Sequence, residues 1–216
     1  MDLKTHWETI YATKEPTEVS WYQPIPQASL DLIALTGVAT TAPIIDVGGG
    51  TSTLVDQLLQ RGYEHLTVLD ISGSALRQAQ VHLSALASSV TWIEDDITQI
   101  TLPPATYSVW HDRAVFHFLT STADRARYLQ AVQHALAPGG YVIVGTFALD
   151  GPEECSNRTV MRYSAGSLHA AFGPSFELLT TRQELHPTPW GTTQSFVYTL
   201  MRAGDDRSAV DSLLQP

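Results

Sequence analysis

Short apolar runs alternate with longer amphipathic segments through the middle of the chain. Runs of consecutive apolar residues predict buried strands, and apolar residues that recur about every 3.6 positions predict helices. Strands that alternate with helices predict a parallel sheet whose connections are right-handed crossovers. The predicted strands are 43–47, 65–69, 90–93, 107–111 and 141–147, and the predicted helices between them are 53–61, 73–87 and 121–136.

The two ends of the chain depart from this alternation. Residues 1–26 hold scattered aromatic residues and two prolines, which predict a helical turn followed by a loop. A helix is predicted next, over 27–36. After the last of the strands above, the pattern predicts a short helix near 165–172 and a hairpin formed by the alternating runs 175–185 and 194–201.

These elements predict an α/β fold. We expect a doubly wound, seven-stranded, Rossmann-like sheet that is mostly parallel and has an antiparallel C-terminal hairpin strand. A chain of 216 residues suits one such domain with a modest appendage. We divide it into an N-terminal aromatic segment over 1–26, the α/β domain over 27–202 and a C-terminal tail over 203–216.

A glycine-rich loop follows the first predicted strand, in the run IIDVGGGTS over 44–52. Glycines at this place let the backbone turn tightly and approach a bound nucleotide closely. A dinucleotide loop has the pattern G-x-G-x-x-G, which Gly48 and Gly50 fit, but Thr53 stands at the third glycine. Asp46, two residues before Gly48, is placed to hold an ammonium group rather than a phosphate.

The next two predicted strands also end in acids. Asp70 lies twenty residues after Gly50, where a carboxylate can accept both hydroxyls of a ribose. The strand 90–93 leads into Glu94, Asp95 and Asp96, and an acid there can accept the exocyclic amine of an adenine. One carboxylate each for an ammonium, a ribose and an adenine describes S-adenosylmethionine, which carries no phosphate.

Over roughly residues 40–148 the chain resembles the class I S-adenosylmethionine-dependent methyltransferases. Their motif acid-x-Gly-x-Gly-x-Gly maps onto Asp46, Gly48 and Gly50, with Ser52 in place of the last glycine. The family's ribose acid maps onto Asp70. Its adenine-site acid maps onto Asp96, and the adjacent Asp95 could exchange roles with it. Pro-Gly-Gly at 138–140 matches the family's turn into the fifth strand.

The resemblance implies a methyltransferase sheet that binds S-adenosyl-L-methionine and releases S-adenosyl-L-homocysteine. The segment 1–26 has too many aromatic residues for a solvated tail, and Pro24 and Pro26 stiffen its connection to the next helix, so we predict that it folds over this cofactor as a lid. The cofactor-binding residues that we predict on these grounds are Trp21, Tyr22, Asp46, Gly48, Gly50, Asp70, Ile71, Asp96 and Ile97.

The segment that leaves the fourth predicted strand, VWHDRAVFHF over 109–118, is the next candidate for chemistry. Ligands of open parallel sheets bind beyond the carboxyl ends of the strands. We predict Asp112, Arg113 and His117 as catalytic residues, and we interpret His111 as a strand-end residue. A nitrogen acceptor must lose a proton, for which Asp112 or His117 could serve as the base. A thiolate acceptor needs only a positive partner such as Arg113.

A narrower resemblance concerns the same segment and the N-terminal aromatics. Trp-x-Asp-Arg is similar to the Trp-Asp-Arg-Gly of the thiopurine methyltransferases, with His111 inserted between Trp110 and Asp112. Both segments are also similar to small methyltransferases related to the mitochondrial citrate synthase lysine methyltransferase. The N-terminal residues that match loosely are Trp7, Tyr11, Trp21, Tyr22 and Gln23.

These resemblances agree on the cofactor and leave the acceptor open. We predict methyl transfer to a nucleophilic sulfur, nitrogen or oxygen atom of a small molecule, with a protein lysine as the alternative. Two further classes remain, a non-catalytic S-adenosylmethionine-binding protein and a nicotinamide-dependent oxidoreductase. Thr53 and the set of acids argue against the oxidoreductase.

Composition narrows the remaining choices. A formal charge of −10 argues against a nucleic-acid partner, because such proteins neutralise phosphates with Lys and Arg. The single cysteine, Cys155, excludes an internal disulfide and suits a reducing compartment. No apolar run suits a signal peptide or a bilayer span, so we expect a cytoplasmic protein with no membrane partner. No Cys cluster or H-E-x-x-H motif predicts a metal site.

Overall fold

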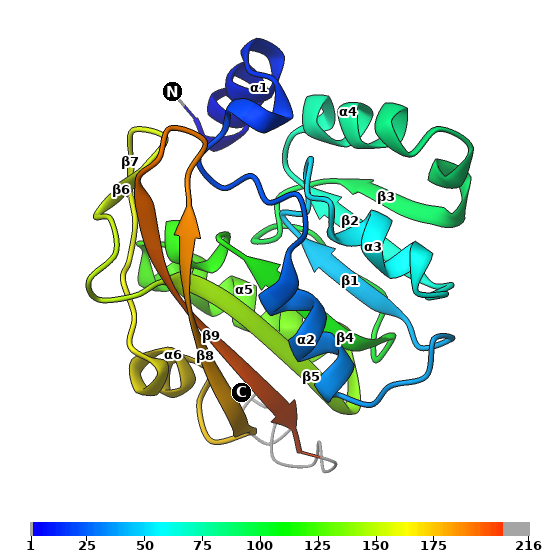
Figure 1. Ribbon diagram of the computed structural model, residues 1–216. Coiled ribbons are helices and arrows are strands. Elements are labelled where there is room, and N and C mark those ends of the chain that lie inside the picture. Colours follow the sequence, from blue (N-terminus) through cyan, green and yellow to red (C-terminus); the bar gives the residue numbers. More distant parts are fainter. Residues whose placement is uncertain (1, 205–216) are drawn as a thin grey trace.

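Seven strands form one sheet in the order β3-β2-β1-β4-β5-β9-β8, as Figure 1 shows for the computed structural model. The structure describes residues 2–204. The strands of this sheet are β1 Ile44–Val47, β2 Leu66–Asp70, β3 Val90–Glu94, β4 Tyr107–Arg113, β5 Leu136–Phe147, β8 Phe176–Pro187 and β9 Thr193–Ala203. A separate two-stranded hairpin pairs β6 Glu154–Cys155 with β7 Arg158–Thr159.

The pairings confirm the predicted mixed sheet. Strand β1 pairs in parallel with β2 and β4, β2 with β3, and β4 with β5. Strand β9 pairs antiparallel with both of its neighbours, β5 and β8. The chain adds β2 and β3 on one side of β1 and then crosses to add β4 on the other. Ligands of open parallel sheets bind at this reversal of strand order.

Helices cover both faces of the sheet, as a doubly wound fold requires. On one face α2 (Gln27–Leu35), α3 (Leu54–Gln60) and α4 (Gly73–Leu83) share a core with the strands. On the other face α5 (Thr122–Ala135) and α6 (Ala165–Phe172) form a second core. Short 3-10 turns occupy Pro16–Glu18, Ser84–Ser89 and Phe116–Phe118.

The alternation of side chains along β4 divides its residues between the two cores. Val109 packs with the α2–α4 core and Trp110 with the α5–α6 core. Because successive strand side chains point to opposite faces, His111 and Arg113 lie on the α2 side and Asp112 lies on the α5 side. This division fixes which polar residues of β4 can reach a ligand on either face.

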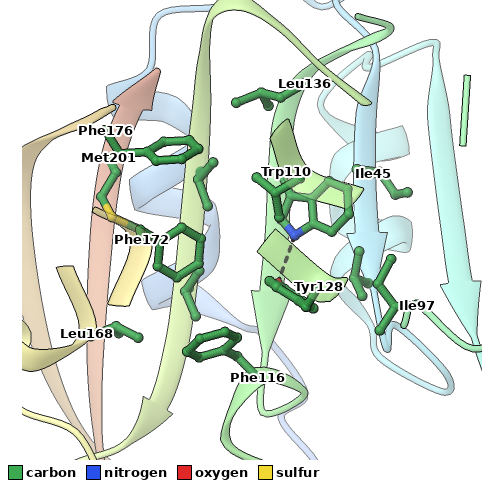
Figure 2. Packing of buried hydrophobic residues seen from close by; sticks show 14 of the residues in the cluster. Ile45, Ile97, Trp110, Phe116, Tyr128, Leu136, Leu168, Phe172, Phe176 and Met201 are labelled. Carbon is green, nitrogen blue, oxygen red and sulfur yellow. Dashed lines mark hydrogen bonds between the residues drawn. The ribbon is translucent and has the colours of Figure 1, made fainter. Parts of the chain in front are cut away.

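Figure 2 shows the core between the sheet and the helices α5 and α6. Trp110 is fully buried, and its indole N–H donates a hydrogen bond to the Tyr128 hydroxyl at 2.9 Å. That hydroxyl in turn donates to Oδ2 of Asp112 at 2.6 Å. The rings of Phe116 and Phe172 lie 5.1 Å and 6.5 Å from the Tyr128 ring. An aromatic core therefore encloses a short chain of hydrogen bonds from the sheet to α5.

The N-terminal segment contains more helix than predicted. Helix α1 (Leu3–Thr13) runs for eleven residues, and the side chain of Asp2 accepts the Thr5 N–H at 3.0 Å as its N-cap. Figure 1 shows α1 (dark blue) beside α4, above the carboxyl ends of the strands. An isolated helix of this length has marginal stability in water, so packing on α4 must stabilise α1. For the same reason, the local sequence pattern did not predict this helix.

Two other boundaries differ from prediction. The predicted helix 73–87 ends at Leu83 and continues as a 3-10 turn. Strand β5 begins at Leu136, directly after α5, rather than at residue 141. Its pairing with β4 shifts between Tyr107 and Val109, and Gly139 has a φ of +67°. The Pro-Gly-Gly segment is therefore an irregularity within the strand, where a left-handed backbone favours glycine.

Strand β9 extends to Ala203, inside the predicted tail, and residues 205–216 of that tail lie outside the described residues. None of the helices within residues 2–204 has the length and apolarity that crossing a membrane requires.

Replacing Tyr128 with Phe should lower the free energy of unfolding by about 2–3 kcal/mol, because the buried Trp110 N–H and Asp112 each lose a partner. Urea unfolding followed by circular dichroism measures the change. Tyr163→Phe is the matched control, because the Tyr163 hydroxyl is buried without a hydrogen-bond partner among the described residues. Similar losses in the two variants would contradict the role of the Trp110–Tyr128–Asp112 chain.

Candidate functional site

Two adjoining pockets open at the carboxyl edge of the sheet, around the glycine loop that follows β1. Their empty volumes, which include space open to solvent, are about 830 Å³ and 490 Å³. Volumes in this range suit small-molecule ligands. Tyr11, Trp21, Gly48 and Arg113 line both pockets, so the two form one continuous site.

Of the two predicted glycines, Gly48 lines both pockets, and Gly50 lies two residues further along the same loop. Gly48 and Gly50 have φ values of +68° and +42°, in the left-handed region that other residues rarely adopt. A Cβ atom on Gly50 would lie 2.9 Å from Oδ2 of Asp70, and one on Gly49 would lie 2.6 Å from Oδ2 of Asp46. Glycines therefore allow two buried carboxylates to approach the loop.

Asp46 lies in the wall of the smaller pocket and is only 5% exposed. Its Oδ1 accepts a hydrogen bond from Nδ1 of His111 at 2.7 Å, because a carboxylate only accepts. The other ring nitrogen of His111 lies 2.8 Å from the Ser29 hydroxyl on α2. Oδ2 of Asp46 is buried and has no hydrogen-bond partner among the described residues. Such an oxygen is costly unless a ligand supplies a donor.

Asp70 ends β2 in the wall of the larger pocket, next to Ile71. Its Oδ1 accepts the Ser72 N–H at 2.8 Å. Burial raises the pKa of Asp70 to about 7, and the neighbouring carboxylates of Asp46 and Glu8 add to this rise. Hydroxyl donors from a ligand would stabilise the ionised form of this carboxylate.

The two candidate acids after β3 both line the larger pocket, together with Ile97. Oδ1 of Asp96 accepts from the N–H and the hydroxyl of Thr98, each at 2.8 Å. Oδ1 of Asp95 accepts the Asp96 N–H at 2.7 Å. Asp96 is half-buried and Asp95 is exposed, so both stay candidates for contact with a ligand.

The N-terminal segment forms the roof of the site. Leu3, Trp7 and Tyr11 of α1 line the larger pocket, and Trp21 lines both pockets. The Trp7 ring lies 5.7 Å from the Trp21 ring and 5.1 Å from that of Phe118, both edge-on. Edge-to-face aromatic contacts of this kind stabilise the roof beyond simple burial. Tyr22, also predicted, lines only the smaller pocket.

Polar contacts fasten the roof to the domain beneath it. Lys4 pairs with Glu94 at 2.7 Å, and both oxygens of the Glu8 carboxylate lie 3.3 Å from the Ser74 N–H. These contacts join α1 to the end of β3 and to the first turn of α4. Exposed pairs of this kind contribute little each, so the aromatic contacts of Trp7, Tyr11 and Trp21 stabilise the roof most.

Arg113 lies at the end of β4, where the two pockets meet. Its Nε donates to the Tyr198 hydroxyl at 2.9 Å, and one terminal nitrogen donates to the Trp21 carbonyl at 3.0 Å. The guanidinium carbon lies 4.4 Å from the centre of the Phe196 ring. The other terminal nitrogen, Nη2, is buried without a hydrogen-bond partner among the described residues. Its N–H groups are thus left to donate to an anion.

Asp112, predicted as a catalytic residue, lies outside both pockets. It is fully buried on the α5 side of β4 and accepts hydrogen bonds from Val115 N–H, Phe116 N–H and Tyr128 at 2.9, 3.1 and 2.6 Å. Burial raises the pKa of Asp112 to about 6. Its oxygens are occupied and face the core, so this carboxylate shapes the turn after β4 instead of touching an acceptor.

His117, the other predicted base, also lies outside both pockets. It is fully buried, with its ring centre 4.5 Å from that of Phe118 and 4.7 Å from that of Phe147. Its Nδ1 accepts the Phe147 N–H at 3.3 Å, and burial lowers the pKa of His117 to about 3. Of the three predicted catalytic residues, only Arg113 lines the site.

His111 and Tyr11 belong to the site, although neither is among the predicted cofactor-binding or catalytic residues. His111 pairs in register with Asp46 across β1 and β4, and only that register brings the two side chains together. Tyr11 is buried in the roof, and a Cβ on Gly50 would lie 3.1 Å from its hydroxyl. The spacing of four residues between Trp7 and Tyr11 was the available signal, because such residues share one face of a helix.

Comparison with known proteins agrees with this geometry. Residues 44–140 match a family described as a methyltransferase domain. The eEF1A lysine and N-terminal methyltransferase of Mus musculus is 23% identical over 138 residues, which make up 64% of this chain and 19% of that protein. The chain therefore spans about a fifth of the length of this curated relative.

Solved structures share the whole fold. A structure reported for the conversion of a disulfide bond into a thioacetal group during echinomycin biosynthesis has a TM-score of 0.75, with 17% identity, over 98% of this chain and 97% of that one. The N-methyltransferase NodS from Bradyrhizobium japonicum WM9, in complex with S-adenosyl-L-homocysteine, has a TM-score of 0.71 at 15% identity, over 94% and 99%. At these identities the likeness establishes the fold.

Asp70→Asn should stabilise the protein at about pH 8 by up to ~4 kcal/mol and have little effect near pH 4. The pKa of Asp70 is higher in the folded protein than its ordinary value, so the fold is more stable while this carboxyl is protonated. That stability is lost as pH rises through about 7. Asparagine keeps the acceptor for Ser72 without the buried charge. Urea unfolding at the two pH values measures the difference, and an equal effect at both would contradict the raised pKa.

Proposed function

We propose that the chain is a class I S-adenosylmethionine-dependent methyltransferase, which binds S-adenosylmethionine across both pockets and methylates a small-molecule nucleophile. One observation carries the proposal. Oδ2 of Asp46 is buried beside the glycine loop without a hydrogen-bond partner among the described residues. An ammonium group is the donor that satisfies such an oxygen best, because it adds charge to the hydrogen bond. When bound, S-adenosylmethionine supplies a methyl group on a positively charged sulfonium.

The other acids fit the rest of the same molecule. We assign Asp70, with Ile71 beside it, to the ribose hydroxyls, and Asp96, with Ile97, to the exocyclic amine of adenine. Asp95 remains the alternative to Asp96. Neighbouring parallel strands lie about 4.8 Å apart, so the acids at the ends of β1, β2 and β3 form a row. The smaller pocket then takes the amino-acid end of the cofactor and the larger one takes its nucleoside.

The chain's contribution to the reaction is mainly positional. Tyr11 and Trp21 line both pockets and close the site from above, which excludes water from the reacting atoms. Fixed orientation of two reactants can lower a barrier by as much as ~7–11 kcal/mol. The leaving group is already activated, so the residues need only hold donor and acceptor in line.

A small molecule is the acceptor that we favour. The pockets are enclosed by the α1 roof, and Arg113 offers a free donor inside them. A protein lysine stays the alternative, because the murine relative is named as a lysine and N-terminal methyltransferase. A cytoplasmic location and the absence of a nucleic-acid partner remain predictions from the sequence.

Calorimetry should detect binding of S-adenosylmethionine, and Asp46→Asn should weaken it at least tenfold, about 1.4 kcal/mol. The substitution keeps the shape and the acceptor for His111 but removes the charge that faces the ammonium. Asp124→Asn is the control, because Asp124 forms a partly exposed pair with Arg127 on α5. Unchanged affinity in Asp46→Asn would remove Asp46 from the cofactor site, and tighter binding of NAD would contradict the cofactor itself.

Trp7→Ala should weaken cofactor binding roughly three- to tenfold, because the roof loses edge-to-face contacts worth about 1 kcal/mol. Circular dichroism should show an intact sheet, since Trp7 lies outside both cores. Trp190→Ala is the matched control, because that side chain is 59% exposed between β8 and β9. Equal affinities in wild type and Trp7→Ala would mean that α1 is a structural element and not a lid.

A further inference from the structure

The larger pocket has two chemically different ends. Its carboxylates belong to Asp70, the last residue of β2, and to Asp95 and Asp96, which follow β3. Four strand spacings separate β3 from β5, which amounts to ~19 Å. In the proposed complex, the nucleoside of the cofactor lies at the end that carries these carboxylates. The opposite end, beyond β4, β5 and β9, is then open to the acceptor, and we call it the acceptor end. The acceptor end is lined by Trp7, Trp21, Arg113, Phe118, Phe147, Cys155 and Phe196.

None of the described residues that line the acceptor end is a carboxylate or a histidine. Arg113 and Cys155 are the ionisable side chains among those that line it. Burial raises the pKa of Cys155 to about 11, so its thiol stays neutral. Behind the wall, Nδ1 of His117 accepts the Phe147 N–H, so Nε2 carries the ring proton and the ring has no free lone pair. Asp112 faces α5 with its oxygens occupied.

The charge at this end is positive. Arg113 donates through Nε to the Tyr198 hydroxyl, and that hydroxyl donates to Oε2 of Glu184 at 2.8 Å. The guanidinium has no direct carboxylate partner among the ion pairs of the described residues, and its Nη2 is unpartnered. An anion in the pocket would therefore gain a charge-assisted hydrogen bond.

The aromatic walls do not favour a lysine. Aromatic enclosures can hold ammonium groups through the faces of their rings. Here the Arg113 guanidinium already lies over the Phe196 ring, 4.4 Å from its centre. A second cation beside it would be repelled, whereas flat apolar molecules would pack against Phe118, Phe147 and Trp7.

We infer that the acceptor is a flat, apolar small molecule that reacts as a preformed anion, a thiolate or phenolate facing Arg113. The inference rests on the proposed methyl transfer and narrows its acceptor. The acceptor gives its proton to water as it binds. Its sulfur or oxygen then bonds to the methyl carbon while the bond from that carbon to the sulfonium breaks, and the electron pair of the broken bond stays on the sulfonium sulfur. No protein group gains or loses a proton.

A binding experiment tests the anion preference without turnover. 4-Nitrophenol and 4-nitrothiophenol change absorbance on ionisation, so each can be titrated on the full chain with S-adenosylhomocysteine present. We expect the bound probe to ionise at least one pH unit lower than the free probe, a tenfold preference for the anion. Arg113→Met should abolish this shift and Arg113→Lys should keep part of it, with thermal melts confirming that both fold and calorimetry confirming that both still bind S-adenosylhomocysteine. A probe that binds as its neutral form, or failure of both probes to bind, overturns the inference.

A transfer experiment separates this inference from the proposed function. Release of S-adenosylhomocysteine is measured with the two probes, with butylamine and with a lysine-containing peptide, across a range of pH. The rate with each probe should follow the acceptor's own ionisation, and His117→Asn should leave that pH profile unchanged. Methylation of the amine or the peptide alone overturns the anionic acceptor and leaves methyl transfer standing. Absence of S-adenosylmethionine binding in calorimetry defeats the proposed function itself.

Discussion

The parallel pairing of β1 with β4 is the constraint on which the rest of the site depends. Its register sets Asp46 opposite His111 and Val47 opposite Asp112. Because side chains alternate along a strand, this register sends His111 to the α2 side, where it holds Asp46 at 2.7 Å, and Asp112 to the α5 side. Arg113 then emerges on the same side as His111, at the junction of the two pockets. A slip of one residue would exchange these roles.

The buried carboxylates of this arrangement lower the stability of the fold. Burial raises the pKa of Asp70 to about 7, and Asp46 keeps one oxygen without a partner among the described residues. The hydrogen-bonded chain from Trp110 through Tyr128 to Asp112 and the aromatic core around it offset part of that cost. A site that binds a cationic, hydroxylated ligand must keep acids out of water, so stability and affinity oppose each other here.

One network joins the N-terminal segment to both pockets. Arg113 binds the Trp21 carbonyl, and Glu184 accepts from both the Tyr198 hydroxyl and the Gln23 amide. The segment between α1 and α2 is thereby tied to β4, β8 and β9. The position of Trp21 at the two pockets thus depends on the same arginine that lies where they meet.

The sequence by itself determined the doubly wound, mostly parallel sheet, the glycine loop and the acids near the ends of β1, β2 and β3. These features depend on short patterns: alternating apolar runs, glycines at positive φ and an acid at each strand end.

Only the tertiary structure decided which residues at and after the end of β4 line the pockets. In the sequence, Asp112 and His117 are candidates as good as Arg113. In the structure, Asp112 is hydrogen-bonded to Tyr128 of α5 and His117 packs between Phe118 and Phe147, so neither lines a pocket. Likewise, α1 becomes a helical roof because α4 lies beneath it, and His111 meets Asp46 because two strands 65 residues apart pair in that register. Local sequence patterns cannot predict such contacts, because the energy of these contacts arises only when distant segments come together.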